Sequence, residues 1–256
     1  MSELLRERQG HIEILTINRP EARNAINGAV SRAFTAAFDE LEADDDCWVV
    51  IVTGSGDKAF SAGMDLKAFT AGESGEIMGA KGGFGGIAQR EFAKPLIAAV
   101  NGSALAGGCE IMLSCDLVVA VEGAMFGIPE VKRGLMAGAG GLIRLPKRIP
   151  PAIALELALT GDPIDAHRAL ALGLINRVVP ADRLMEEALA LAGTIAENAP
   201  LAVRASKRVM KQAGELPDAE GWAVNNAAVP EVFGSADAME GPIAFAEKRK
   251  PHWTGA

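Results

Sequence analysis

Two glutamates occupy apolar, glycine-rich surroundings, where a charged side chain is unusual. Glu110 ends the segment Ala-Gly-Gly-Cys-Glu at 106–110, inside an apolar stretch that runs from 96 to 121, and Glu130 follows Phe-Gly-Ile-Pro at 126–129. Burial raises the pKa of a carboxyl group, and a neighbouring carboxylate pushes the pKa values of two such groups apart. Two carboxyl groups in a dry, protein-walled space therefore suggest general acid and base chemistry.

Three glycine-rich turns, at 59–66, 100–110 and 134–141, each open a segment that we expect to be helical. A helix N-terminus offers unpaired N–H groups and a partial positive charge, which suit an anion or an oxygen atom that gains negative charge. If the first two turns converge, the N–H groups of Met64 and Gly107 can bind one such oxygen together. Glycines at strand–helix junctions also serve backbone conformation and close packing alone, so both interpretations stay open here.

Three other kinds of site are poorly supported. The segment Gly-Ala-Gly-Gly at 138–141 lacks the third glycine of a dinucleotide-binding fingerprint and does not follow a clear strand. The chain has no Gly-x-Ser-x-Gly elbow, and its three histidines lie outside the glycine turns, which leaves a nucleophilic triad unsupported. The three cysteines have no metal-ligand spacing with the histidines, so we expect structural thiols and no metal site.

Composition points to an ordinary soluble globular protein. The 256 residues are 49% hydrophobic, enough for a sizeable core, and 33 acidic against 25 basic residues give a formal charge of -8. This balance argues against a nucleic-acid partner and requires a local basic cluster for any anionic ligand. The charged N-terminus does not resemble a signal peptide, and charges interrupt every long apolar stretch, so we expect a cytoplasmic protein that does not enter membranes.

The elements that position these residues follow an α/β pattern with short strands between glycine turns. Strands are expected at 11–18, 48–53, 97–100, 117–121 and 175–179, and helices at 29–42, 107–114, 140–148, 184–197 and 201–212. The last 60 or so residues should form a helical appendage. Residues 71–86 are rich in glycine and have no usable periodicity, which predicts a mobile loop or lid.

Six motifs, in order and spacing, resemble the crotonase (enoyl-CoA hydratase/isomerase) superfamily over nearly the whole chain. They are Phe-Ser-Ala-Gly-Met-Asp-Leu at 60–66, Asn-Gly at 101–102 with Gly-Gly-Cys-Glu at 107–110, Phe-Gly-Ile-Pro-Glu at 126–130, Gly-Ala-Gly-Gly at 138–141, Leu-Thr-Gly at 159–161 and Phe-Ala-Glu-Lys-Arg at 245–249. The resemblance implies a ClpP-like spiral of ββα repeats over 1–195 with the acyl-CoA site, and a helical trimerisation region over 196–256. It also implies an acyl-CoA thioester substrate, a homotrimer or a hexamer built as a dimer of trimers, and neither a metal nor a cofactor, because coenzyme A is part of the substrate.

The resemblance also implies roles for individual residues. The N–H groups of Met64 and Gly107 match the family's oxyanion hole for the thioester carbonyl. The family's hydratases have glutamate at two acid positions. This chain also has glutamate at both, with the same separation in sequence as in the family. Glu110 and Glu130 would then hold one water, with Glu110 taking a proton as oxygen attacks Cβ and Glu130 delivering a proton to Cα. The implied reaction is syn addition of water to a trans-2-enoyl-CoA in fatty acid metabolism, through an enolate, to give a 3-hydroxyacyl-CoA.

Family precedent also suggests where coenzyme A lies. Residues matching the family's coenzyme A and substrate contacts are Arg23, Ala62, Met64, Asp65, Leu66, Lys67, Gly107, Phe245 and Lys248. Arg23 would lie near the phosphates, and a neighbouring subunit would contribute Phe245 and Lys248. An acidic protein needs such local cations for a phosphorylated ligand, although each cation alone is equally compatible with an ordinary solvated charge.

Several alternatives remain at this stage. Family members that only shift double bonds often keep just the acid at the position of Glu130, so an isomerase stays possible. The segments 60–68 and 240–253 also resemble carnitinyl-CoA dehydratases, which use the same paired glutamates. A non-catalytic acyl-CoA binder is the third alternative. One departure is visible: Ala106 stands where the family's hydratases usually have the first of three glycines, which implies a small change in backbone packing.

Overall fold

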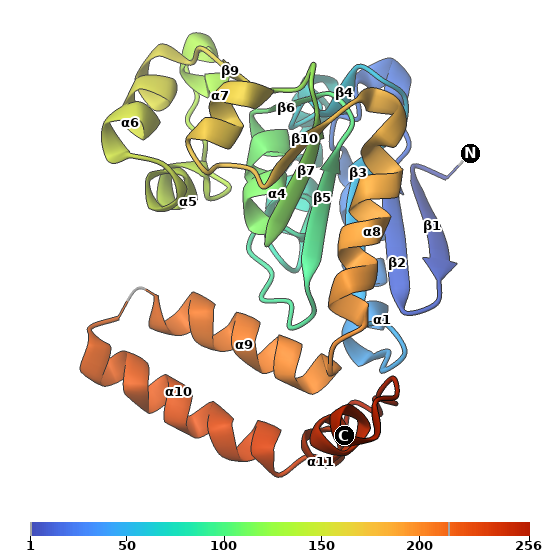
Figure 1. Ribbon diagram of the computed structural model, residues 1–256. Helices are drawn as coiled ribbons and strands as arrows, with labels where there is room; N and C mark the ends of the chain where they lie inside the picture. Colours follow the sequence, from blue (N-terminus) through green and yellow to red (C-terminus); the bar gives the residue numbers. More distant parts are fainter. Residues whose placement is uncertain (1, 215) are drawn as a thin grey trace.

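Two sheets organise the part of the chain that the computed structural model describes, residues 2–214 and 216–256 (Figure 1). The larger sheet has the order β1-β2-β3-β5-β7-β10, with β1 antiparallel to β2 and the remaining pairs parallel. Its strands are β1 (Leu4–Gln9), β2 (Ile12–Ile17), β3 (Val49–Gly54), β5 (Leu96–Val100), β7 (Leu117–Val121) and β10 (Arg177–Val179). The parallel strands β2, β3, β5 and β7 are largely buried on both faces, as their near-continuous runs of Val, Ile, Leu and Ala require, whereas β10 is partly buried.

The smaller sheet has the order β4-β6-β8-β9, and its first three strands run parallel. Its strands are β4 (Ala59–Ser61), β6 (Ser103–Leu105), β8 (Met125–Gly127) and β9 (Ile164–Asp165). The chain alternates between the sheets, because β3, β5 and β7 are each followed by a short strand of the smaller sheet and then by helical structure. This repetition is the predicted spiral of ββα units, which is confirmed.

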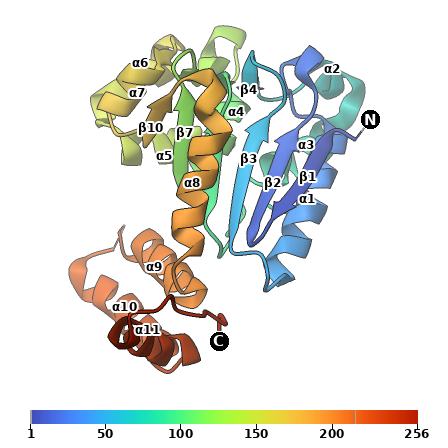
Figure 2. The same ribbon diagram turned by 45° about the vertical axis from the view of Figure 1, so that its right-hand side comes forward.

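Helices cover both faces of the larger sheet (Figures 1 and 2). Helix α1 (Gly28–Ala43) begins where the Asn27 side chain accepts a 2.9 Å hydrogen bond from the Val30 N–H, and its apolar stripe, which includes Phe34 and Phe38, is fully buried. Helix α8 (Leu184–Ala196) lies along the opposite face and contacts β2, β3, β5 and β7. The other core helices are α2 (Leu66–Ala68), α3 (Ser74–Met78), α4 (Gly107–Ser114), α5 (Gly141–Arg148), α6 (Pro151–Thr160) and α7 (Ala166–Ala171).

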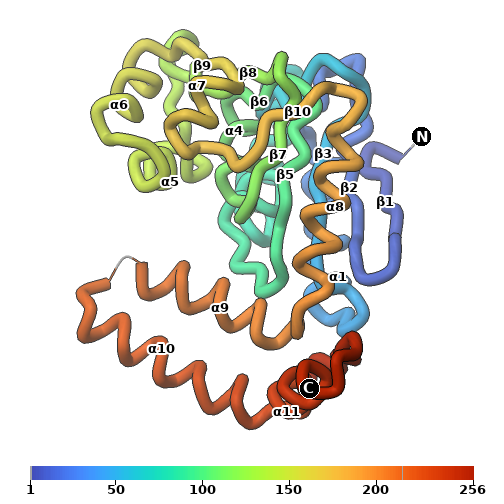
Figure 3. The backbone as a smooth tube through the Cα atoms, in the orientation of Figure 1, coloured from blue at the N-terminus to red at the C-terminus, as the bar shows by residue number. Residues whose placement is uncertain are grey.

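The C-terminal helices α9 (Pro200–Ala213), α10 (Asp218–Phe233) and α11 (Ala236–Glu247) form a separate layer, with α9 and α10 side by side (Figure 3). Lys207 of α9 connects this layer to the core: its Nζ lies 2.7 Å from an Asp116 carboxylate oxygen and donates a 2.6 Å hydrogen bond to the Lys94 carbonyl. The predicted helical appendage is therefore confirmed, while a domain boundary at 195/196 stays a prediction.

Strand β1 was not predicted, since it gives no alternating apolar signal. Among its six residues only Leu4 is buried, and the others are exposed at the edge of the sheet. Its pairing with β2 comes from backbone hydrogen bonds and from Arg6 and Arg8, which both bind the buried carboxylate of Glu13. An exposed edge strand rich in charges also resists pairing with other chains.

The segment 71–86, where the sequence shows no usable periodicity, contains helical turns, and its mobility or role as a lid stays a prediction. The segment holds the π-helical turn η2 (Phe69–Glu73), α3 and the 3-10 turn η3 (Phe84–Gly86). Contacts to α1 fix it: a Glu73 carboxylate oxygen accepts a 2.9 Å hydrogen bond from the Gly28 N–H, and Arg32 pairs with Glu76. These partners lie more than 40 residues away in sequence, so local periodicity does not reveal them.

Candidate active site

The three glycine turns meet at one edge of the smaller sheet. They follow β4, β6 and β8, which are parallel neighbours, so their carboxyl ends lie together. A Cβ atom added to Gly63 would lie 2.7 Å from the Gly107 nitrogen, and one added to Gly108 would lie 2.1 Å from the Ser61 carbonyl oxygen. Only glycine permits backbones to approach this closely. The turns that carry Met64 and Gly107 are therefore packed against each other.

The Met64 N–H points away from its own strand partner. Ile26 pairs with the residues on either side of Met64, since the Ile26 N–H donates to the Gly63 carbonyl at 2.8 Å and the Asp65 N–H donates to the Ile26 carbonyl at 2.9 Å. Gly107 is the first residue of α4, where an N–H has no partner within the helix. Within 2–214 and 216–256 neither N–H donates a hydrogen bond, so both are available to an external oxygen.

Ala106 adopts a backbone conformation that favours glycine. Its φ is +53° and its ψ is −131°, and its N–H donates a 3.0 Å hydrogen bond to the Gly127 carbonyl of β8. An alanine held at positive φ stores about 1–3 kcal/mol of strain. Alanine at position 106 therefore acts on backbone energy as well as on packing. Phe84 closes the other side, because a Cβ on Gly107 would meet its ring at 2.5 Å.

Glu110 lies in the first turn of α4 with 3% of its surface exposed. Its Oε1 accepts hydrogen bonds from the Ala139 N–H at 2.7 Å and from the Gly141 N–H at 2.8 Å. Burial raises the pKa of this carboxyl group, and the two N–H donors oppose that rise. The third glycine turn thus binds an anion, as a helix N-terminus can, but the anion is the chain's own carboxylate.

Glu130 lies in the 3-10 turn η4 (Pro129–Arg133) and is half-buried. Its Oε2 is buried and has no hydrogen-bond partner. Its pKa is raised to about 7, chiefly by burial and to a smaller extent by the Glu110 carboxylate. The Glu110 charge thus acts on Glu130, while a joint role of the two carboxyl groups in catalysis stays a prediction. The turn between Glu130 and Gly141 links them, since the Leu135 N–H donates to the Glu130 carbonyl at 3.1 Å.

The residues matched to coenzyme A contacts lie in two separate places. Arg23 is beside the first turn, where its carbonyl accepts a 3.0 Å hydrogen bond from the Ala62 N–H, and with Lys58 it lines a cavity of about 310 Å³. Leu66 and Lys67 are exposed at the start of α2. The Asp65 carboxylate caps that helix through the N–H groups of residues 67 and 68 and pairs with Arg19 at 2.9 Å. It is therefore engaged within the chain.

Phe245 and Lys248 lie at the end of α11, in the C-terminal layer. Phe245 is 86% exposed, and Figure 2 shows α2 and α11 at opposite ends of the molecule. One chain therefore does not bring these two residues to Arg23 and Lys67. Their contribution from a neighbouring subunit stays a prediction.

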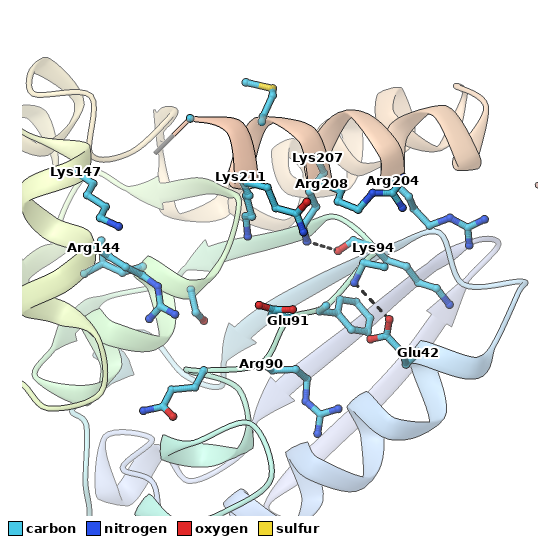
Figure 4. Close-up of a pocket in the computed structure, with 18 of the residues that line it drawn as sticks. Glu42, Arg90, Glu91, Lys94, Arg144, Lys147, Arg204, Lys207, Arg208 and Lys211 are labelled. Atoms are coloured by element: carbon cyan, nitrogen blue, oxygen red, sulfur yellow. Dashed lines mark hydrogen bonds between the residues drawn. The ribbon is translucent and has the colours of Figure 1, made fainter. Parts of the chain in front are cut away.

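A cavity of about 1640 Å³ separates the C-terminal layer from the core (Figure 4). Its lining is strongly basic, with nine cationic side chains against three glutamates, in a protein of net charge -8. The cations are Arg90, Lys94, Arg144, Lys147, Arg148, Arg204, Lys207, Arg208 and Lys211. None of the predicted site residues lines this cavity. Arg144 connects this cavity electrostatically to the glutamate pair, because its charge lowers the pKa of Glu110.

Among residues 2–214 and 216–256, no group of three His, Cys, Asp or Glu residues is placed to hold a metal ion. The three cysteines are free and buried, and burial raises the pKa of each thiol, as expected for structural residues. Among the helices of residues 2–214 and 216–256, none has both the length and the apolarity to cross a membrane.

Some site residues escaped sequence analysis. Ala139 and Gly141, which hold Glu110, lie in a turn that the sequence indicated as a possible anion site and as a family motif, without assigning Glu110 as its partner. Phe84 and Lys58 carry no motif, and nothing in the sequence places them beside Gly107 or Arg23. The glycines at 138, 140 and 141 were the available signal, because a glycine-rich helix start marks a place where another group approaches the backbone.

Comparison with known proteins agrees with this geometry. The sequence model of a family described as enoyl-CoA hydratase/isomerase matches residues 7–256. The chain belongs to the enoyl-CoA hydratase/isomerase family. Carnitinyl-CoA dehydratase of Salmonella typhi is 44% identical over the full length of both chains. The family membership confirms the crotonase-type fold that the motifs implied.

Solved structures of family members superpose closely on this chain. Enoyl-CoA hydratase from Mycobacterium tuberculosis H37Rv is 51% identical with a TM-score of 0.95, and carnitinyl-CoA hydratase from Mycobacterium avium is 47% identical with a TM-score of 0.79. Both comparisons cover the whole of both chains. The family is one of enzymes, and its members named here act on different acyl groups, so the substrate of this chain is a separate question.

Proposed function

We propose that this protein is an enoyl-CoA hydratase that adds water in the syn sense to trans-2-enoyl-CoA in fatty acid metabolism. The observation that carries the proposal is the pair Glu110 and Glu130 beside two free backbone N–H groups. Coenzyme A arrives with the substrate, so the proposal needs no resident cofactor.

The thioester carbonyl binds at the N–H groups of Met64 and Gly107. When oxygen attacks Cβ, negative charge moves to the carbonyl oxygen, and two preorganised donors in a dry site stabilise that enolate. Loss of one such donor typically costs about 10²–10³ in kcat. The close packing of Gly63 against Gly107 holds the donors in place before substrate binds.

The two carboxyl groups then divide the proton transfers. Glu110 receives two N–H donors on Oε1, which favour its ionised form, so it takes the proton from water. Glu130, with a pKa of about 7 and an unpartnered buried oxygen, can hold a proton at neutral pH and deliver it to Cα. The water thus supplies the hydroxyl group at Cβ and leaves its proton on Glu110, Glu130 gives its own proton to Cα, and transfer of one proton from Glu110 to Glu130, directly or through solvent, restores the starting states.

Substitution of each glutamate tests this proposal. Glu110→Gln and Glu130→Gln should each lower kcat for hydration of crotonyl-CoA by about 10²–10⁴ while binding of coenzyme A and circular dichroism stay unchanged. Glu122→Gln is the matched control, because Glu122 is an exposed glutamate that lies between Glu110 and Glu130 in the sequence. Near-normal rates in both site variants would refute the assignment.

A second candidate is a hydro-lyase acting on carnitinyl-CoA. It is favoured by the similarity to carnitinyl-CoA dehydratase at 44% identity over the whole chain. It uses the same addition or elimination of water, so the glutamate pair fits both candidates. The two differ in the acyl group beyond Cβ, where carnitinyl thioesters carry a trimethylammonium group.

We also propose that three copies form a closed ring, which could pair into a hexamer. Two faces of the chain expose large apolar side chains. On α5 and α6 they are Leu142, Ile143, Leu155 and Leu159, and on α10 and α11 they are Trp222, Val229, Phe233, Met239, Ile243 and Phe245. Such patches mark contact surfaces between proteins. A contact between two different faces of identical chains builds a ring when the rotation from one chain to the next closes. The second face carries Phe245, so the same contact can bring it to a neighbour's coenzyme A.

A further inference from the structure

The cavity between α5 and α9 holds a concentration of positive charge that is unusual in so acidic a protein. Nine cationic side chains and three glutamates line it, while the whole chain has a net charge of -8. Figure 4 shows Arg144 and Lys147 of α5 and the α9 side chains Arg204, Lys207 and Lys211 around the same space. A cleft lined by one sign of charge focuses the electrostatic potential and concentrates ions of the opposite sign. The cavity therefore attracts anions.

Most of the α9 cations already have a carboxylate partner. Lys207 and Lys211 share Asp116, with Nζ to carboxylate oxygen distances of 2.7 and 2.6 Å, and Arg208 pairs with Glu231. Two lysines on one carboxylate leave a net positive charge at this side of the cavity. They also leave no oxygen of Asp116 free for the cations of α5.

Arg144 and Arg148 lack a carboxylate partner. They lie one turn apart on α5, are half-buried, and both line the cavity. In the part of the chain that the structure describes, neither forms an ion pair, and each donates to a backbone carbonyl, Arg144 to Ala139 at 3.4 Å and Arg148 to Cys115. Burial and the charge of Arg148 lower the pKa of Arg144, and like charges one turn apart destabilise a helix. An anion bound to both side chains would relieve both costs.

Two guanidinium groups facing one space favour a phosphate group. Each presents a planar fork of N–H donors that can bind two oxygens of a phosphate at once. We propose that the cavity binds a small phosphate-bearing anion through Arg144 and Arg148, with the α9 cations on its other side, and that this anion is an effector of the enzyme. The site is separate from the predicted coenzyme A contacts, because none of them lines the cavity.

A small anion fits the cavity better than a segment of a second copy does. The large exposed apolar side chains of α5–α6 and α10–α11, which we assign to subunit contacts, lie outside the cavity lining. The lining itself is mainly charged. Attraction of an ion, rather than burial of apolar surface, is the interaction that such a lining supplies.

The effector role rests on the proposed hydratase function and on the contacts of Arg144. Its guanidinium group donates to the Ala139 carbonyl, and the Ala139 N–H in turn holds Glu110. A Cβ on Gly140 would lie 2.3 Å from the Arg144 Nη1, so the guanidinium group lies directly against this turn. A ligand that binds Arg144 therefore acts on the turn that positions Glu110.

Charge gives the direction of the effect. The charged and titratable groups that interact with Glu110 are Arg144, Glu130 and the Cys109 thiol, whose pKa of about 12 keeps it neutral. The positive charge of Arg144 lowers the pKa of Glu110. A bound anion offsets that charge, so the pKa of Glu110 rises and less of it is ionised. Removal of the proton from water should then be slower, and the loss should grow as the pH falls.

Calorimetric titration of the intact protein with inorganic pyrophosphate at low ionic strength tests the site without any need for activity. We expect a Kd below about 1 mM, both without coenzyme A and in protein saturated with it. Arg148→Gln should weaken binding at least about 10-fold, whereas Arg168→Gln, at an exposed arginine of α7 outside the cavity, should stay within about 2-fold of wild type. Absence of binding, or displacement of pyrophosphate by coenzyme A, would overturn the proposal.

A second variant guards against misfolding of the first. Arg204 lies on the α9 side, where its guanidinium group donates only to the Gly255 carbonyl at 3.5 Å, and Arg204→Gln should weaken pyrophosphate binding about 3-fold with unchanged circular dichroism. Wild-type affinity in both variants would contradict the site. A smaller assembly in Arg148→Gln with unchanged pyrophosphate binding would assign the cavity to a second copy of the chain and would also overturn the proposal.

Kinetics test the effector role. Saturating pyrophosphate should lower kcat for hydration of crotonyl-CoA about 2- to 10-fold near pH 6 and less near pH 8, and in Arg148→Gln the ratio of kcat with and without pyrophosphate should be close to one. Equal inhibition by sodium chloride of the same ionic strength, or a rise in KM alone, would refute the effector role. Hydration by none of the proteins would refute the hydratase function and leave the binding result standing.

Discussion

Glu110 and Glu130 are the same residue type in different surroundings, and the surroundings separate their chemistry. Glu110 is held by two backbone N–H groups, whereas Glu130 has a buried oxygen without a partner. The sequence could identify this pair, because acids among apolar residues and glycines are rare and visible. It could not identify Ala139 and Gly141 as the donors, since backbone N–H groups leave no trace in residue types.

The raised pKa of Glu130 predicts a cost in stability. Its pKa of about 7 lies above the value of about 4.3 for a glutamate in an unfolded chain, so the folded state binds more protons between these values. The free energy of unfolding therefore falls as pH rises through this window. Glu130→Gln removes the titration, and we expect it to exceed wild type in stability by about 1–2 kcal/mol at pH 8.

Urea unfolding at several pH values measures this difference. The gain in Glu130→Gln should vanish near pH 4, where both side chains are neutral, and the exposed Glu122→Gln should show no such trend. A gain that does not depend on pH would show that Glu130 is not the titrating group. Stability given up at a catalytic residue is a common feature of active sites.

At the scale of elements, the helix that begins at Gly141 positions Glu110. A Cβ on Gly141 would lie 3.1 Å from the Glu110 Oε1 and 3.2 Å from the Ala137 Cβ, so Gly141→Ala should displace the carboxylate. We expect kcat for hydration to fall about 10- to 100-fold with little change in binding of coenzyme A. Steady-state kinetics and calorimetric binding measure the two effects.

Gly138→Ala supplies a matched control in the same turn. A Cβ there would meet only the Met136 carbonyl oxygen, at 3.9 Å, and the residue does not need a positive φ. Its kcat should stay within about 2-fold of wild type. Equal losses in the two variants would mean that the turn as a whole, rather than the contact with Glu110, sets the rate.

Elements were predictable from sequence where their signal is local. The spacing of apolar residues predicted α1, α4, α8 and α9 within one or two residues, and buried runs predicted β3, β5 and β7. Edge strand β1 and the helical segment from η2 to η3 depend on partners far away in sequence, so no local pattern reveals them. The ββα spiral itself came from the family resemblance.

At the scale of the whole molecule, the exposed apolar faces of α5–α6 and α10–α11 predict association. Wild type should elute as a trimer or hexamer, and Leu159→Lys, at a side chain 74% exposed, should shift it towards the monomer. Light scattering coupled to size-exclusion chromatography measures the mass. Leu5→Lys, at an exposed leucine of β1, is the control and should keep the wild-type mass.

A monomeric wild type would contradict this assignment of the two faces. It would also leave Phe245 and Lys248 without a route to coenzyme A, because a single chain holds them at the far end of the molecule. The sequence alone does not predict which apolar side chains stay exposed. Leucines that face the core and leucines that face solvent or another subunit both recur at helical spacing.

The central claim is that two carboxyl groups act on one water beside an enolate. The most direct measurement is mass spectrometry of the product formed from crotonyl-CoA in deuterated, oxygen-18-labelled water. The account predicts that oxygen-18 at Cβ and deuterium at Cα enter together, and that both are lost in Glu110→Gln and Glu130→Gln. Deuterium entering without oxygen-18 would indicate a double-bond isomerase, and firm binding of the thioester with neither label would indicate a non-catalytic binder; either result would contradict the account.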